Sequence, residues 1–185
     1  MSVSFALRSM LRTIVAVPVV ATAIALGAAL AAKAETAAEP PPKAGYWHDW
    51  TDGKGVSHLT RCELNKFELE AMAPPADPEW TNRQDPGNAT VLTVVQPTGW
   101  KGPWHKETTV LWIVTLKGTW FIEAMDGTKV DLKPGDVWLA EDRDSKPDAE
   151  GRVGHRSGNI GDDPLTLMVV QLEAPPTVDQ PCRFK

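Results

Sequence analysis

Apolar and polar residues alternate along the second half of the chain in short runs that are typical of β-strands. Turn residues separate the runs, and the strongest signal is Asp126-Gly127, because Asp-Gly between two alternating runs is typical of a tight hairpin. The predicted strands lie at 108–116, 119–125, 128–132, 137–141 and 161–172. Many short strands with frequent turns predict an all-β sandwich or barrel.

Two earlier segments are also predicted to contain strands. Residues 89–96 are apolar and β-branched on both faces, which favours a central, buried strand. Residues 57–72 contain two short strand-like runs. Helix competes with strand for the second run, because Glu, Leu, Lys and Ala are good helix formers.

The first 34 residues differ from the rest of the chain. Arg8 and Arg12 precede an uncharged apolar run at 13–32, and the residues up to Ala34 fit the small-x-small rule for cleavage. This pattern predicts a secretory signal at 1–34 that is removed after Ala34, and a periplasmic or secreted protein. An uncleaved anchor helix is the alternative, because about 20 apolar residues can span a bilayer.

The remaining chain divides into a lead-in and a barrel. Residues 35–50 are expected to form a Pro-rich linker that ends in an aromatic run at 46–50. This run is expected to pack on the outside or at one mouth of the barrel. Residues 51–185 are expected to form the barrel itself.

Removal of the signal lowers the formal charge of the chain from −5 to −8, because the signal contains three basic residues and no acidic one. Nucleic acids and anionic membrane surfaces bind basic patches. We therefore expect no nucleic-acid partner and no stable membrane association after cleavage. The sequence leaves a homodimer open.

Cys62 and Cys182 are the two cysteines of the chain. In an exported protein a single pair is most simply one disulfide, which here would tie an early strand to the C-terminus. The chain has no C-x-x-C motif, so thiol catalysis is not expected.

Two histidines and a carboxylate are the candidate functional residues. His105 and Glu107 lie two residues apart at the entrance to a strand, where this spacing directs both side chains to one face. His155 begins a late strand. Two histidines and one carboxylate can hold a divalent metal and leave positions open for substrate or oxygen. Alternatively, the three residues are ordinary polar groups of the barrel. His48 and His58 have no partner at metal-ligand spacing and are expected to be structural or exposed.

The order of these features resembles the cupin family over roughly residues 97–172. Cupins carry a first motif of Gly, His-x-His, Glu and Gly, and a second motif of Pro-Gly-Asp followed later by a His and an Asn. The corresponding residues here are Gly99, His105, Glu107 and Gly118, and then Pro134, Gly135, Asp136, His155 and Asn159. The resemblance implies a double-stranded β-helix, a cupin-like jelly-roll barrel open at one end, with metal ligands at His105, Glu107 and His155.

The chain departs from the family pattern in three places. Glu107 stands where cupins have the second His, and Leu111 stands where they have the Glu seven residues before Gly118. A longer charged loop at 141–152, expected to be a solvated surface loop, replaces the Pro-Gly approach to His155.

Together with the predicted signal, the resemblance implies an exported cupin-like protein that binds a small molecule inside the barrel. In one alternative the barrel holds Fe(II), Mn(II), Ni(II) or Zn(II), and this metal supports oxygenase- or isomerase-type chemistry. In the other, the protein is a non-catalytic, metal-free binding or assembly protein. Large apolar Trp side chains near the motifs are expected to line the ligand pocket, with ordinary core or subunit packing as the alternative. They are Trp100, Trp104, Trp112, Trp120 and Trp138.

The predicted signal is tested by expressing the full chain in an exporting bacterium and sequencing the N-terminus of the mature protein. We expect the mature chain to begin at Glu35. A chain that retains residues 1–34 and stays in the membrane fraction would support the anchor helix instead.

Overall fold

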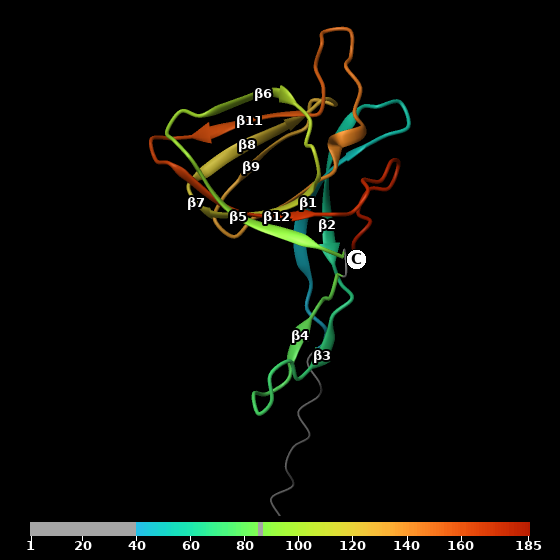
Figure 1. Cartoon of the computed structure of the whole chain (residues 1–185), viewed down its shortest axis with the longest axis vertical. Coiled ribbons are helices and arrows are strands. Elements are labelled where there is room, and N and C mark those ends of the chain that lie inside the picture. The colour runs from blue at the N-terminus through green and yellow to red at the C-terminus, as the bar shows by residue number, and fades with distance from the viewer. Residues whose placement is uncertain (1–39, 85–86) are drawn as a thin grey trace, which may run out of the picture. The chain divides into compact units, whose positions relative to one another are not determined.

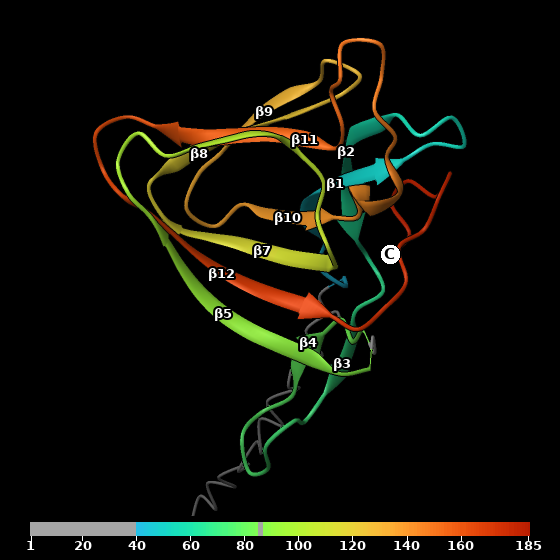
Figure 2. The same cartoon turned by 45° about the horizontal axis from the view of Figure 1, so that its top comes forward.

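The predicted strands fold into two β-sheets that face each other across a barrel (Figures 1 and 2). The structure is a computed structural model that describes residues 40–84 and 87–185. The predicted signal, its cleavage site and the first part of the linker lie outside the described residues. Within the described ranges, no helix is long and apolar enough to cross a membrane.

The strands follow one another along the chain with a single 3₁₀ turn among them. They are β1 (Ala44–Thr51), β2 (Ser57–Leu64), β3 (Glu68–Glu70), β4 (Glu79–Thr81), β5 (Ala89–Gln96), β6 (Lys101–His105), β7 (Val110–Lys117), β8 (Thr119–Ala124), β9 (Lys129–Leu132), β10 (Val137–Ala140), η1 (Asp142–Asp144), β11 (His155–Ile160) and β12 (Leu165–Leu172). Six strands form one sheet in the order β2-β1-β10-β7-β12-β5, and four form the other in the order β6-β11-β8-β9. The β3–β4 hairpin extends away from the barrel (Figure 1).

The inner faces of both sheets form the main core. Leu111 and Ile113 of β7 face inward, as do Trp120 and Ile122 of β8 on the opposite sheet. Strand periodicity accounts for this, because alternate side chains of a strand point to opposite faces. The predicted fold class is confirmed: the described chain is an all-β, jelly-roll-like barrel of two facing sheets.

A second apolar cluster covers the outer face of the six-stranded sheet. Tyr46, Val110 and Leu139 are buried there, and Phe184 from the C-terminal segment packs against them. The Tyr46 hydroxyl donates a hydrogen bond to the Phe184 carbonyl at 2.8 Å. Burial raises the pKa of Tyr46 to about 12, so this donor keeps its proton at neutral pH.

The predicted cysteine pair is present in the structure. Cys62 of β2 is joined by a disulfide to Cys182, 120 residues later in the chain. The bond holds the C-terminal segment against the outer face of the sheet. It is compatible with an oxidising compartment.

The prediction of a central strand at residues 89–96 is wrong. These residues form β5, the edge strand of the six-stranded sheet, and Val91 and Val95 are 63% and 62% exposed. The other side of the strand carries Leu92 and Val94, which line a cavity. One apolar face of β5 is therefore a cavity wall. An apolar pattern on both faces does not by itself distinguish an edge strand from a central one.

The prediction for the aromatic run at 46–50 is correct for Tyr46, which packs on the outside, but wrong in placing the run before the barrel. The run lies in β1, which pairs with β2 on one side and in parallel with β10 on the other. Tyr46 joins the outer cluster, while Trp47 packs against the inner core. Aromatic residues on both faces are accommodated because this strand has apolar layers on both of its sides.

The disulfide is expected to contribute strongly to stability, because it restricts a long loop in the unfolded chain. On the chain-entropy model, replacing Cys62 and Cys182 by Ser should lower the free energy of unfolding by about 4–5 kcal/mol, measured by urea denaturation of the oxidised protein and the variant. Thiol titration of the unfolded, unreduced wild-type protein should detect no free thiol. Two free thiols would contradict the pairing.

Candidate metal and ligand site

Two histidines face each other at one end of the four-stranded sheet. His155 begins β11 and His105 ends β6, and the antiparallel pairing of these strands sets the two residues directly opposite each other. Their ring centroids are 4.4 Å apart. Residues fifty positions apart in the sequence are thus brought together by strand register.

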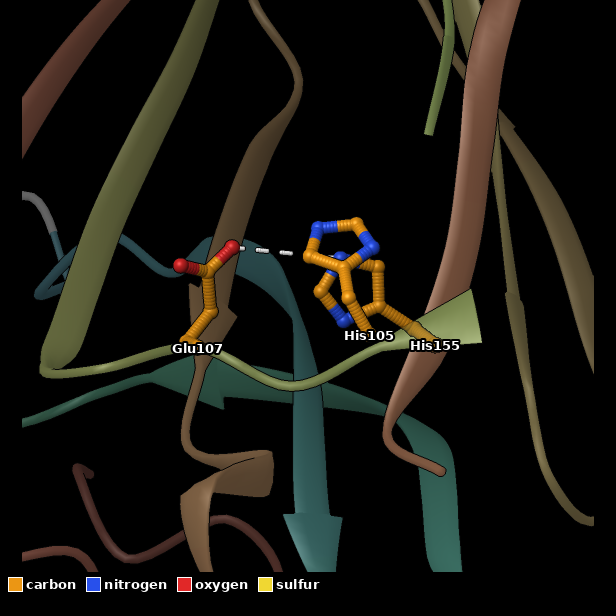
Figure 3. A group of neighbouring side chains, drawn as sticks. All are labelled: His105, Glu107 and His155. Atoms are coloured by element: carbon orange, nitrogen blue, oxygen red, sulfur yellow. Dashed lines mark ion pairs between the residues drawn. The ribbon is translucent and has the colours of Figure 1, made fainter. Parts of the chain in front are cut away.

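Glu107 completes a group of three side chains (Figure 3). It follows β6 by two residues, and its Oε1 lies 3.8 Å from Nε2 of His155. The ligand atoms of His105, Glu107 and His155 all lie within 4.8 Å of one another. The structure therefore brings together the three residues that the sequence nominates.

The hydrogen bonds of the two imidazoles determine which nitrogen is free. Nδ1 of His105 lies 2.6 Å from the Pro103 carbonyl, and Nδ1 of His155 lies 2.7 Å from Oδ2 of Asp142. A carbonyl and a carboxylate only accept hydrogen bonds, so both Nδ1 atoms carry the proton. In the neutral rings Nε2 is then the unprotonated nitrogen, which is the form that binds a metal. This donor set fits a divalent transition metal.

The prediction of a solvated loop at 141–152 is wrong at its beginning. Glu141 and Asp142 are fully buried, and Ser145 is 1% exposed. Asp142 turns toward the site, where its Oδ1 accepts the backbone N–H of Glu107 at 2.9 Å. The charged composition of the loop predicts solvent exposure. The partners that allow these acids to be buried lie elsewhere in the sequence, so the loop's own sequence does not reveal them.

Glu141 points away from Asp142 into a second buried polar group. Its carboxylate lies 2.8 Å from Nε2 of His48 and 2.8 Å from a guanidinium nitrogen of Arg183. Nδ1 of His48 accepts the backbone N–H of Cys182. His48 is thus structural, as expected. His58 is partly exposed between Asp52 and Asp126.

Asp49 of β1 is a further acid behind the site. It is fully buried, its Oδ2 lies 3.5 Å from Nδ1 of His155, and neither oxygen has a hydrogen-bond partner in the described part of the chain. Burial and the charge of Asp142 raise the pKa of Asp49 well above its ordinary value. Sequence reasoning missed this residue because it lies in the aromatic run that was not expected to reach the barrel interior.

Burial and charge shift the pKa values of all three candidate ligands. Burial opposes the charged form of His155, but the charge and hydrogen bond of Asp142 and the charge of Glu107 raise its pKa overall. Burial and the neighbouring His155 lower the pKa of His105. Burial raises the pKa of Glu107 against the attraction of His155. The pair of histidines therefore differs in proton affinity, and His105 is the more readily deprotonated.

Gly154 allows the close approach of strands at the site. Its φ of 66° is in the left-handed region, and a Cβ there would collide with the His105 carbonyl oxygen and with Oδ2 of Asp142. Glycine is the residue that both accepts this backbone conformation and leaves this space free. The position directly before His155 is therefore part of the site's construction.

A cavity of about 210 Å³ lies beside the three residues. Of the five predicted pocket tryptophans, Trp100, Trp120 and Trp138 line it. Trp112 lies outside it, because it alternates with Leu111 and Ile113 and packs against Tyr46 and Phe184 on the outer face. Trp104 also lies outside the cavity, with the guanidinium groups of Arg152 and Arg156 near its ring.

Leu111 lines the same cavity, at the position where the cupin motif has a Glu. An apolar side chain there supplies no metal ligand. At this cavity the candidate ligands are two imidazoles and one carboxylate. The ligand atoms of Asp49, Asp142 and His155 also lie within 4.8 Å of one another, but neither aspartate lines the cavity.

Comparison with solved structures finds matches of low sequence identity. No family model and no curated protein matches the chain. A cupin domain from Bordetella pertussis has 15% identity and a TM-score of 0.34, covering 46% of this chain and 82% of that one. The cupin domain of Schizosaccharomyces pombe Cnp3 has 12% identity and a TM-score of 0.34, covering 72% and 84%.

The raised pKa of Asp49 makes stability depend on pH. Above the ordinary Asp pKa of about 3.9 and below the raised value, the folded state keeps a proton that the unfolded state has lost, so stability falls as pH rises. Asn cannot titrate. The free energy of unfolding of Asp49→Asn relative to wild type should therefore increase from pH 4 to pH 8, measured by urea denaturation with a chelator present.

Asp144→Asn is the control, because it makes the same change at an exposed aspartate in η1. A difference between Asp49→Asn and wild type that stays constant over this pH range would show that Asp49 ionises normally in the folded protein.

Proposed function

We propose that this protein is an exported, cupin-type protein that binds a small molecule inside its barrel beside a divalent transition metal held by His105, Glu107 and His155. The opposed pair of histidines carries the proposal. Each ring donates its Nδ1–H to a neighbouring oxygen, which leaves Nε2 unprotonated when the ring is neutral. A carboxylate lies within the same group.

Two imidazoles and a carboxylate are a ligand set suited to Fe(II), Mn(II), Ni(II) or Zn(II). When bound, such a metal polarises a substrate or activates oxygen or water, which supplies oxygenase- or isomerase-type chemistry. Asp142 supports the set by holding the His155 ring. The apolar cavity wall limits access of bulk water to it.

The cavity lining supports a small ligand. No Lys or Arg is among the residues that line the cavity, and Leu92, Leu167 and Val169 contribute apolar surface. Its volume of about 210 Å³ is below the range of roughly 300–1,000 Å³ that holds drug-sized molecules.

Two lining side chains favour a ligand that carries both a hydrogen-bond acceptor and a donor. Nε1 of Trp138 and Oε1 of Gln96 are buried and have no hydrogen-bond partner in the described ranges. A buried polar atom without a partner is costly, and a bound molecule can supply the missing bond. Trp138 would donate to the ligand, and Gln96 would accept from it.

Export is supported by the predicted signal at 1–34 and by the disulfide between Cys62 and Cys182. Disulfides persist in oxidising compartments such as the periplasm. A periplasmic or secreted location is therefore part of the proposal.

The alternative is a metal-free protein that binds a ligand or assembles with a partner without catalysis. Leu111 is the observation in its favour, because an apolar side chain occupies the position of a family ligand. The two functions differ in whether the purified protein contains metal.

The metal site is tested by elemental analysis of mature protein purified without chelators. We expect close to one equivalent of Fe, Mn, Ni or Zn, or uptake of one equivalent when the protein is incubated with each ion. In the His105→Ala, His155→Ala double variant, bound metal should fall to background because only one of the three ligands remains.

The matched control is His58→Ala, which removes a histidine from the surface between Asp52 and Asp126 and should leave the metal content unchanged. Wild-type protein that takes up none of the four ions would rule out the metal site and favour the metal-free alternative.

A further inference from the structure

We propose that Asp142 is the positioning residue of this site, and that its single carboxylate holds both His155 and Glu107 in place. The inference rests on the proposed metal site but concerns a residue from the segment between β10 and β11, outside the ligand set. Its basis is a pair of hydrogen bonds that the fully buried Asp142 carboxylate accepts.

The two oxygens of Asp142 contact two different parts of the site. Oδ2 lies 2.7 Å from Nδ1 of His155, and Oδ1 accepts the backbone N–H of Glu107 at 2.9 Å. His155 and Glu107 belong to separate segments of the chain. One carboxylate therefore fixes the distance and orientation between two of the three candidate ligands.

The contact between Asp142 and Nδ1 of His155 determines which ring nitrogen of His155 faces the cavity. A histidine that donates its Nδ1–H to a carboxylate has its ring orientation and tautomer fixed, so that Nε2 is available to a ligand. The Nε2 of His155 lies 3.8 Å from Oε1 of Glu107. The backbone contact places this Glu107 carboxylate on the same side of the ring.

The fold holds Asp142 in this position from both sides. On one side lies Glu141, whose backbone N–H donates to the Asp49 carbonyl at 2.8 Å. The Glu141 carboxylate is bound by His48 and Arg183. On the other side, the Asp142 carbonyl accepts the N–H of Ser145 at 2.9 Å. The missing side chain of Gly154 leaves room for Oδ2.

Asp49 does not replace Asp142 in this role. Its Oδ2 is 3.5 Å from the same nitrogen of His155, and neither of its oxygens has a hydrogen-bond partner within the described residues. Asp49 also makes no contact with the backbone of Glu107 that matches the one made by Asp142. Loss of Asp142 should consequently not be compensated by its neighbour.

The test compares wild-type protein with Asp142→Asn. Asn has nearly the same size, but it has one acceptor oxygen, so it cannot serve both contacts, and it removes the negative charge. We expect the affinity for Zn²⁺, measured by competition with a chromophoric chelator, to fall by about 10–100-fold. Asp144→Asn, in the same 3₁₀ turn and exposed, should bind Zn²⁺ as wild type does.

A second measurement reads the positioning without metal. Nitrogen-15 NMR of the histidine rings in chelator-treated wild-type protein should show neutral His155 with its proton on Nδ1. In Asp142→Asn the neutral ring should show a mixture of the two tautomers. Circular dichroism and thermal unfolding of the metal-free variant establish that it is folded.

The results separate the two proposals. Unchanged Zn²⁺ affinity together with an unchanged His155 tautomer in Asp142→Asn would overturn the positioning role. Wild-type protein that binds no metal would contradict the proposed function, while the tautomer of His155 would still decide the role of Asp142. If Asp142→Asn does not fold, a wild-type His155 with its proton on Nε2 is sufficient to overturn the inference.

Discussion

The antiparallel pairing of β11 with β6 is the constraint on which the candidate site depends. It sets His155 opposite His105. A shift of one residue in this register would turn one imidazole to the other face of the sheet, because strand side chains alternate. The register is held by the packing of both sheets around one core. It is also held by Gly154, which lets the segment before β11 lie close to the end of β6.

Buried charge is the second constraint. Asp49, Glu141, Asp142, His48 and His155 are each 1% exposed or less. A buried ion is costly unless it is paired and hydrogen-bonded. Glu141 is balanced by Arg183 and His48, and Asp142 by His155 and the N–H of Glu107. The neighbouring acids thus face opposite ways, one toward the C-terminal segment and one toward the site.

This arrangement connects the disulfide to the site through a few residues. Cys182 is bonded to Cys62, and Arg183 next to it pairs with Glu141. Glu141 in turn precedes Asp142, which contacts His155. The C-terminal segment therefore stabilises the base of the site as well as the outer face of the sheet.

Much of the fold could be predicted from the sequence, because it follows from local patterns. Alternation predicts the strands β7 and β8 whatever their neighbours are, and the Asp-Gly turn correctly predicts the β8–β9 hairpin. A hairpin between β7 and β8 is not formed, because these strands lie in opposite sheets. The edge position of β5 and the burial of β1 could not be predicted, since they depend on which strands lie alongside. For the site, the i, i+2 spacing and the cupin motifs nominated His105, Glu107 and His155. Asp49 and Asp142 were missed, because an acid in a charged or aromatic run gives no local sign that a distant histidine is its partner.

The central claim is that His105, Glu107 and His155 form one metal site at the cavity. The most direct measurement is anomalous X-ray diffraction at the zinc absorption edge from crystals of the mature protein grown with Zn²⁺. We expect one strong anomalous peak within bonding distance of Nε2 of His105, Nε2 of His155 and the Glu107 carboxylate. A fully hydrated cavity with no peak there, or a peak held only by other residues, would contradict it.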